Sequence, residues 1–253
     1  MTERLPLFPL GTVLFPGLVL PLHVFEERYR ALVRHLTRDE ATGRTFGVVA
    51  IRLGRETGSG AAVVDAGERG AVVGDAGERG AAVADAAERG PADITLHQVG
   101  CTAEIRQMTS HPDGRFDLVT VGRRRFRIHE LFPDDEPFLQ ADVEWISEPE
   151  ADQRAERLVP GLLQLFQRYL ELIRTDGHHG TEQLPDDPAV LSYLIGATTV
   201  LALDDRQDLL AADTIADRLA LERRLLNREL VLLREINALP VPLGDLAVAY
   251  SDN

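Results

Sequence analysis

The sequence predicts an α+β protein, in which a small curled β-barrel of mixed strand pairing is followed by a bundle of helices. Up to about residue 148, short β-branched and alternating runs are interrupted by prolines and glycines, with one helical segment among them. From Ala151 onward, apolar residues recur every three or four positions, as in helices that bury one face. We therefore expect a β domain over 1–148, with a flexible insertion at about 54–93, and a helical subdomain over 149–253.

The first region is expected to contain two short strands, a helix and a third strand. The first two strands should lie around 5–7 and 18–22, and the β-branched run 46–51 suits a buried strand. Between them, apolar side chains at helical spacing predict a helix with one buried face. These side chains are Phe25, Tyr29, Leu32, Val33 and Leu36.

A ten-residue unit of the type Ala-Ala-Val-Val-Asp-Ala-Gly-Glu-Arg-Gly occurs three times, at 61–70, 71–80 and 81–90. Each unit offers only a few small apolar side chains, which cannot offset an ordering entropy of about 1–2 kcal/mol per residue. We therefore predict a flexible loop. The alternative is an arm that engages a partner, with its Ala-Val pieces adding as strands to an exposed sheet edge.

Alternation returns after the insertion and predicts strands over 94–108, 115–128 and 138–146. His111-Pro-Asp-Gly114 supplies a hairpin turn between the first two. The helical region should hold three or four helices, including one that begins at Thr214, where Asp217 completes a capping-box spacing, and ends before Pro240. The apolar stripe of the first of these helices consists of Leu158, Leu162, Leu165, Phe166, Tyr169, Leu172 and Ile173.

Composition restricts the class of protein. The net charge of −14 disfavours nucleic acid and anionic membranes as partners, because both repel an acidic surface. Cys101 is the single cysteine, so neither an internal disulfide nor a cysteine-rich zinc site is expected. The longest apolar runs are broken by Pro and Gly, and no secretory signal is recognised at the N-terminus. These features predict a cytoplasmic protein without a membrane segment, a metal or a cofactor.

Several motifs carry a family resemblance. Leu7-Phe8-Pro9 and Leu20-Pro21-Leu22 are followed by the helix start Phe25-Glu26-Glu27-Arg28-Tyr29. The chain resembles the Lon substrate-recognition (N-terminal) domain in these motifs, and the resemblance continues in the runs 46–49, 99–105 and 117–128. It implies a PUA-like β pseudobarrel that binds unfolded or exposed polypeptide segments. It also implies polypeptide-binding side chains in and near the helix start and on the arginine-rich strand, namely His23, Glu26, Arg28, Tyr29 and Arg125.

The absence of lysine decides what kind of relative to expect. All 27 basic side chains are arginine. A Lon-type protease cuts with a Ser-Lys dyad and binds ATP with a phosphate-loop lysine, and neither is possible without lysine. We therefore expect a non-catalytic recognition domain without ATPase or protease domains, which works with a separate protease or chaperone in protein quality control. The oligomeric state does not follow from the sequence.

Each candidate residue also has a structural explanation. Tyr29 lies on the apolar stripe of its helix, and acids such as Glu26 are favoured near a helix start. In the arginine-rich strand, alternation places Arg125 on a face expected to be solvated or ion-paired, and Phe126 in the core. His178 and His179 alone are too few ligands for a metal site.

Two other functions stay open. The first is an accessory factor of an ATP-dependent protease, or an enzyme whose site is not recognised. Ser110 and Ser192 lack the flanking residues of a nucleophile elbow, which argues against a serine hydrolase. The second is an RNA-binding module, since PUA-like folds also bind RNA in other families, an argument from fold analogy alone.

Overall fold

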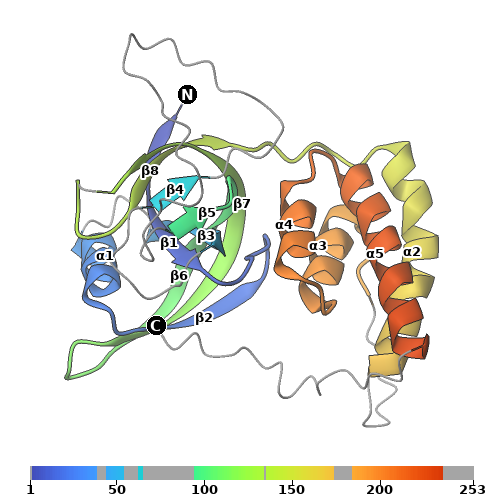
Figure 1. The fold of residues 1–253 in the computed structure, drawn as a ribbon, viewed down its shortest axis with the longest axis horizontal. Coiled ribbons are helices and arrows are strands. Elements are labelled where there is room, and N and C mark those ends of the chain that lie inside the picture. Colours follow the sequence, from blue (N-terminus) through green and yellow to red (C-terminus); the bar gives the residue numbers. More distant parts are fainter. Residues whose placement is uncertain are drawn as a thin grey trace.

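A computed structural model describes residues 2–38, 44–53, 62–64, 94–133, 135–173 and 184–235 (Figure 1). The strands are β1 (Glu3–Leu10), β2 (Val19–Val24), β3 (Thr45–Leu53), β4 (Ala62–Val64), β5 (Ile94–Leu96), β6 (Val99–Ser110), β7 (Phe116–Phe132) and β8 (Gln140–Trp145). The helices are α1 (Glu27–Arg38), α2 (Gln153–Ile173), α3 (Pro188–Thr198), α4 (Leu203–Ala211) and α5 (Ile215–Glu235). The predicted α+β class, with a β part followed by helices, is confirmed.

Five strands close into a ring. β1 pairs in parallel with β3 and antiparallel with β8, and the ring continues through β7 and β6 back to β3. β2 adds to β7, while β5 and β4 extend the sheet from β3. The single strand expected over 94–108 is two strands, because the chain turns at His97 and Gln98 between β5 and β6. This break lets β5 continue along β3 while β6 enters the ring.

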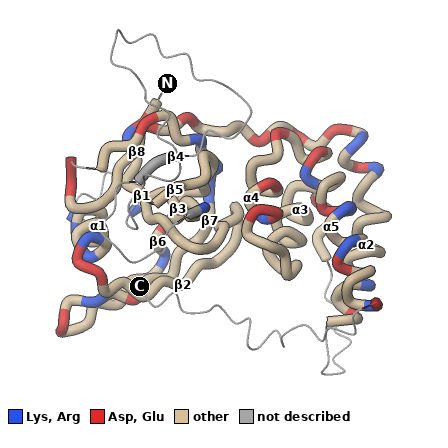
Figure 2. The backbone as a smooth tube through the Cα atoms, viewed as in Figure 1, with Lys and Arg blue, Asp and Glu red and all other residues tan. Residues whose placement is uncertain are grey.

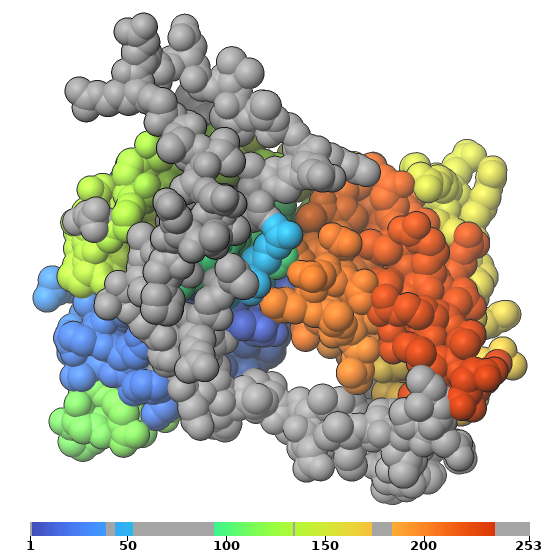
Figure 3. Space-filling model, in the orientation of Figure 1, coloured from blue at the N-terminus to red at the C-terminus, as the bar shows by residue number. Residues whose placement is uncertain are grey.

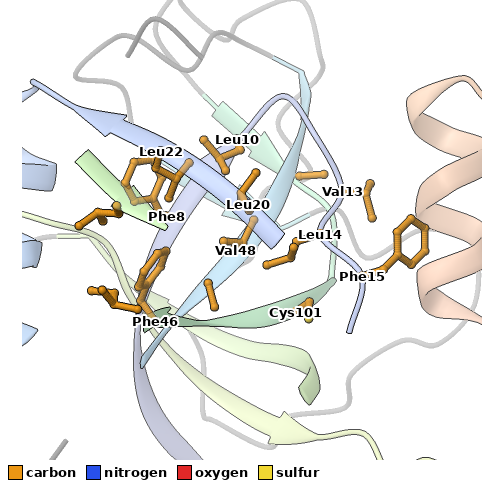
Figure 4. Close-up of a cluster of buried hydrophobic side chains, with 14 of the residues drawn as sticks. Phe8, Leu10, Val13, Leu14, Phe15, Leu20, Leu22, Phe46, Val48 and Cys101 are labelled. Atoms are coloured by element: carbon orange, nitrogen blue, oxygen red, sulfur yellow. The ribbon is translucent and has the colours of Figure 1, made fainter. Parts of the chain in front are cut away.

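Helix α1 packs against the barrel core through four of the five side chains that the sequence predicted, since Phe25 precedes the helix and is only partly buried. Tyr29, Leu32, Val33 and Leu36 are buried, and the Tyr29 ring stacks on Phe8 with ring centroids 3.9 Å apart. A helix of three turns is only marginally stable in isolation, so the packing of these four apolar side chains on the barrel stabilises it. Figure 4 shows Phe8 among the core side chains.

The long strand β7 changes partner halfway along its length. Its first half pairs with β2 on one edge and with the second half of β6 on the other. These three segments, β2 with 105–110 and 116–121, form a three-stranded extension that we call the β-arm. As expected, the arm ends in a hairpin turn, where Gly114 adopts a positive φ of 84° and its N–H donates to the His111 carbonyl at 2.9 Å.

The helices form a bundle with its own apolar cluster, built mainly from α2, α3 and α5. The capping role predicted for Thr214 is confirmed, since its Oγ1 accepts from the Asp217 N–H at 3.1 Å. Asp187 caps α3 in the same way, and Pro188 occupies the first turn of that helix, where its missing N–H costs nothing.

The helical bundle and the barrel share a core. Phe15 follows β1 and points towards a helix, where its ring lies 6.1 Å from that of Tyr193 (Figure 4). Leu209, Leu210 and Leu225 belong to the same buried cluster as the barrel side chains. Figure 3 shows the helices, in orange and red, packed beside the blue and green barrel. Apolar contacts cross the predicted domain boundary at 148/149, so the division into two domains stays a prediction.

Some expectations fall outside the described residues. His178, His179 and residues 236–253 are among these, as is the repeat insertion except for 62–64. Those three residues form β4, which pairs in parallel with β5, so the first Ala-Val run of the repeat is a strand rather than part of a loop. The sequence predicted a loop here, but valine favours strands and β5 offers a sheet edge with which this run can pair. No described helix combines the length and the hydropathy needed to cross a membrane.

Candidate functional site

The outer face of the β-arm carries an exposed apolar patch. Val19 lies opposite Val121, and Pro21 lies opposite Val119. Directly opposed residues share a sheet face, so these four side chains lie together, and we call them the arm patch. Val19 is 62% exposed and the other three are partly exposed. β2 contains no charged side chain and is drawn in tan in Figure 2.

The other face of the same strands is buried, which explains the position of the patch. Leu20 and Leu22 alternate with Val19 and Pro21, and both point into the barrel core (Figure 4). Because successive side chains of a strand point to opposite faces, burying the leucines forces the neighbouring apolar side chains outward. The patch is therefore a consequence of a strand that is apolar on both faces.

A polar cluster lies at the hairpin end of the patch. His23 Nδ1 lies 2.5 Å from Asp117 Oδ1, and His111 Nε2 lies 2.5 Å from Asp117 Oδ2. Hydrogen bonds from His23 and then His111 lower the pKa of the Asp117 carboxyl. Arg115 reaches the outer nitrogen of His23 at 3.5 Å. The cluster supplies polar groups beside an apolar surface, an arrangement typical of binding sites.

Three of the predicted site residues lie where β2 passes into α1. His23 is at the end of β2, and Arg28 Nε donates to Glu26 Oε2 at 2.8 Å at the helix start. Tyr29 comes next in the sequence, yet it is only 1% exposed, and the Arg28 guanidinium lies 4.4 Å from its ring centroid. In this structure Tyr29 is a core residue beneath the surface that Glu26 and Arg28 form.

Arg125 lies apart from the other four, in the joint with the helices. Its Nη1 donates to the carbonyls of Leu210 at 2.6 Å and Ala212 at 2.7 Å, and its side chain pairs with Glu148. Of the two environments expected for Arg125, the solvated one is wrong, since Arg125 is 1% exposed, and the ion-paired one is confirmed by Glu148. Helices cover this face of β7, whereas the neighbour Arg123 is exposed and pairs with Glu104 at 2.5 Å. The core position predicted for Phe126 is confirmed.

A second buried arginine joins this polar cluster. Arg218 Nε donates to the Leu209 carbonyl at 3.0 Å, so Arg125 and Arg218 together satisfy carbonyls at the C-terminal end of α4. Glu148 pairs with both guanidinium groups and accepts a hydrogen bond from the Tyr193 hydroxyl. Sequence periodicity did not identify Arg218 or Glu148 as members of a buried cluster. A signal was available for Arg218 alone, because it is next to Leu219 on the buried stripe of α5.

Glu222 is buried on α5, and its titration makes stability depend on pH. Desolvation raises the pKa of its carboxyl well above the usual value, against the opposing effect of Arg218. The folded state therefore keeps a proton that the unfolded chain releases, and stability falls as pH rises from the unfolded pKa towards the folded one.

We expect Glu222→Gln to raise the free energy of unfolding at neutral pH by at least about 1 kcal/mol, with the difference disappearing near pH 4. Chemical denaturation at a series of pH values measures this. The exposed Glu235→Gln is the control and should track the parent. A Glu222→Gln curve parallel to that of the parent at all pH values would contradict the assignment.

Two of the nucleophilic side chains that the structure describes, Cys101 and Ser192, are buried. Burial raises the pKa of the Cys101 thiol to about 12, which makes it unreactive. The buried Ser192 hydroxyl donates to the Ala189 carbonyl at 2.8 Å. Within the described ranges, no group of three or more His, Cys, Asp or Glu side chains could hold a metal ion.

Comparison with known proteins places this geometry in a family. The family model described as the ATP-dependent protease La (LON) substrate-binding domain matches residues 4–228. The Lon protease of Anaeromyxobacter dehalogenans is 27% identical over 238 residues, which cover 92% of this chain and 24% of that protein. Lon protease 2 of Myxococcus xanthus is also 27% identical, over 240 residues covering 93% and 25%. The chain thus spans about a quarter of the length of these relatives.

Solved structures agree on the fold. The N-terminal domain of Mycobacterium avium complex Lon protease matches with a TM-score of 0.61 at 17% identity, covering 89% of this chain and 98% of that one. The Lon N-terminal domain protein from Xanthomonas campestris matches with a TM-score of 0.53 at 26% identity, with the same coverage. The fold is therefore shared with Lon N-terminal domains, and the family-model match over residues 4–228 shows that this chain is a member of the LON substrate-binding domain family.

Proposed function

We propose that this chain is a non-catalytic domain that binds unfolded or exposed polypeptide segments through the arm patch. The observation that carries the proposal is the row of apolar side chains around Val19, which is 62% exposed on a strand without charges. Contiguous exposed apolar side chains mark interaction sites more often than isolated ones do. Membership of a substrate-binding family supports the same conclusion.

The chemistry of the surface suits a segment of mixed character. Apolar side chains of an unfolded polypeptide can pack on Val19, Pro21 and Val119, and the polar groups of His23 and Arg115 lie at the hairpin end of the patch for its main chain or polar side chains. The area is small, so binding by one domain is weak. Weak contacts become effective when several are linked, as in an oligomeric protease.

In this proposal the catalytic steps belong to a separate protease or chaperone. The 253 residues contain no lysine, so neither a Ser-Lys dyad nor a phosphate-loop lysine lies within them. The chain would act as an adaptor in protein quality control, delivering segments that folded proteins normally bury.

We expect Val19→Asp to weaken binding of an unfolded protein about tenfold, since burying one valine contributes roughly 1.5 kcal/mol and a buried carboxylate is unfavourable. The measurement is fluorescence anisotropy of fluorescein-labelled, reduced and carboxamidomethylated lactalbumin titrated with the protein. Val231→Asp is the matched control, because Val231 is similarly exposed, at 57%, but lies on α5.

The same titration separates the proposed function from RNA binding. Apolar binding should persist as salt is raised, whereas affinity for RNA falls steeply. The proposal fails if the parent does not bind lactalbumin saturably, or if the Val19 and Val231 variants lose affinity equally. Salt-sensitive binding of single-stranded RNA, without lactalbumin binding, would favour the RNA-binding alternative.

A further inference from the structure

We propose that the outer edge of β6 at residues 107–110 accepts an extended polypeptide segment as an added strand; this inference rests on the proposed function and places main-chain recognition next to the arm patch. β6 pairs with β7 along nearly its whole length, but with β3 only from Cys101 to Glu104. Past Arg44, whose carbonyl accepts from the Ile105 N–H at 3.0 Å, no described strand pairs with this edge.

Among the described residues, nothing pairs along the side of this edge, and its residues are exposed on both faces. Every side chain from 106 to 110 is exposed, whereas most residues of the first half of β6 are buried. In an antiparallel strand, alternate residues direct both N–H and C=O away from their partner, so an edge of this length offers unpaired main-chain donors and acceptors. Natural edges are usually blunted by charges or proline, and the run Gln-Met-Thr-Ser has neither.

Two features limit the length of the added strand. The pairing of β6 with β7 shifts register between Ile105 and Gln107, which makes a bulge at Arg106. At the other end the hairpin turn begins, where the His111 N–H donates to the Arg115 carbonyl at 2.9 Å. An incoming segment can therefore form a regular ladder over about four residues, which suits a weak and sequence-tolerant interaction.

The side chains beside the edge select an apolar residue in that segment. Leu22, Leu118 and Met108 lie opposite one another in a row across the inner face of the arm. Leu22 and Leu118 are buried, but Met108, the outermost member, is 38% exposed. A fourth strand would extend this row, and its apolar side chain would cover Met108. Methionine adapts to neighbours of different shape, which favours tolerance of sequence.

The edge and the arm patch form one continuous surface. On the outer face, Gln107 lies opposite Val119, which is opposite Pro21. A segment paired with β6 can thus direct alternate side chains to the row of Met108 on one face and towards the arm patch on the other. Main-chain pairing and apolar contact would be made by the same short segment.

Charge favours another polypeptide over a second copy of this chain. Arg106 and Arg123 both pair with Glu104, at 3.2 and 2.5 Å, which leaves one positive charge in excess at the barrel end of the edge. We therefore expect the bound segment to carry an acidic side chain near Arg106. Two copies of the chain, each with a net charge of −14, repel each other.

Hydrogen–deuterium exchange tests the edge directly. With saturating unlabelled lactalbumin of the kind described above, amides in 107–110 should exchange at least about tenfold more slowly, because strand addition gives the outward N–H groups acceptors. Amides of 231–235 on α5 should not change. Binding without protection of 107–110 would overturn the edge site and leave the proposed function standing, whereas absence of binding would remove both.

Matched variants test the side chains. Met108→Lys should weaken lactalbumin binding about tenfold, since one apolar contact is lost and a charge is introduced. Leu172→Lys, at a similarly exposed position on α2, should bind like the parent. Arg106→Glu should weaken binding more than Arg234→Glu, an equal charge change on α5. Equal effects within either pair would contradict the proposal.

Self-association has a distinct signature. If a second copy occupied the edge, 107–110 would be protected without lactalbumin, the protein would have the mass of a dimer, and dilution would remove the protection. That result would overturn the choice of occupant.

Discussion

Arg125→Met is expected to lower the free energy of unfolding by about 3 kcal/mol or more, because removal of one partner from a buried charged cluster leaves the others uncompensated. Arg125 donates to the carbonyls of Leu210 and Ala212 and pairs with Glu148. Methionine has a similar length and is apolar, so it leaves these groups without their donor. Chemical denaturation measures the loss.

The neighbouring Arg124→Met is the matched control. Its guanidinium lies 4.3 Å from the centre of the Trp145 ring and is exposed, so the expected loss is below about 1 kcal/mol. A loss for Arg125→Met no larger than that for Arg124→Met would show that the buried cluster does not stabilise the joint. Hydrogen exchange in α4 should also accelerate in the Arg125 variant, because its C-terminal carbonyls lose their donors.

Gly122→Ala is the second change with a large expected effect, a loss of about 3 kcal/mol from overpacking. A Cβ at Gly122 would lie 2.2 Å from the Phe15 carbonyl oxygen, a backbone atom that cannot rotate away. The same glycine donates to the Leu18 carbonyl at 2.8 Å and accepts from the Gly17 N–H at 2.9 Å. The methyl group would therefore push away the segment that holds Phe15 against the helices. Thermal or chemical denaturation measures the effect.

Gly161→Ala is the control for Gly122→Ala. Gly161 lies inside α2, and a Cβ there meets no atom within 4 Å. Alanine should therefore stabilise the protein by about 0.5–1 kcal/mol, through higher helix propensity. Opposite signs for the two glycine substitutions are the expected outcome. Destabilisation by less than about 1 kcal/mol for Gly122→Ala would mean that the segment around Phe15 moves without cost.

Local patterns predicted most of the elements. The helical spacing around Tyr29 and Leu32 predicted both α1 and its buried face, and the turn at Gly114 followed from its residue types. These signals depend on neighbours only a few residues apart, which is why they survive without tertiary information. The break at His97 was missed, although the apolar positions change phase there, from 94 and 96 before it to 99, 101 and 103 after it.

The candidate site was only partly accessible to the same reasoning. Alternation in β2 is enough to place Val19, Pro21 and His23 on one face, yet it does not say whether that face is covered. For Arg125 the alternation allowed a solvated or an ion-paired side chain, and it did not show that helices cover this face of β7. The edge at 107–110 depends on where β3 stops pairing with β6, and that depends on a strand more than fifty residues earlier.

The sequence by itself determined the fold class, the family, the buried face of α1 and the absence of any lysine-dependent chemistry within the chain, because these depend on residue types and short-range spacing. Only the tertiary structure decided that Arg125 is buried, that the arm patch is exposed and that, among the described residues, one edge of β6 is open. The physical reason is that burial and edge pairing depend on which distant segments cover a strand, and the free energy of those contacts is not carried by any local pattern.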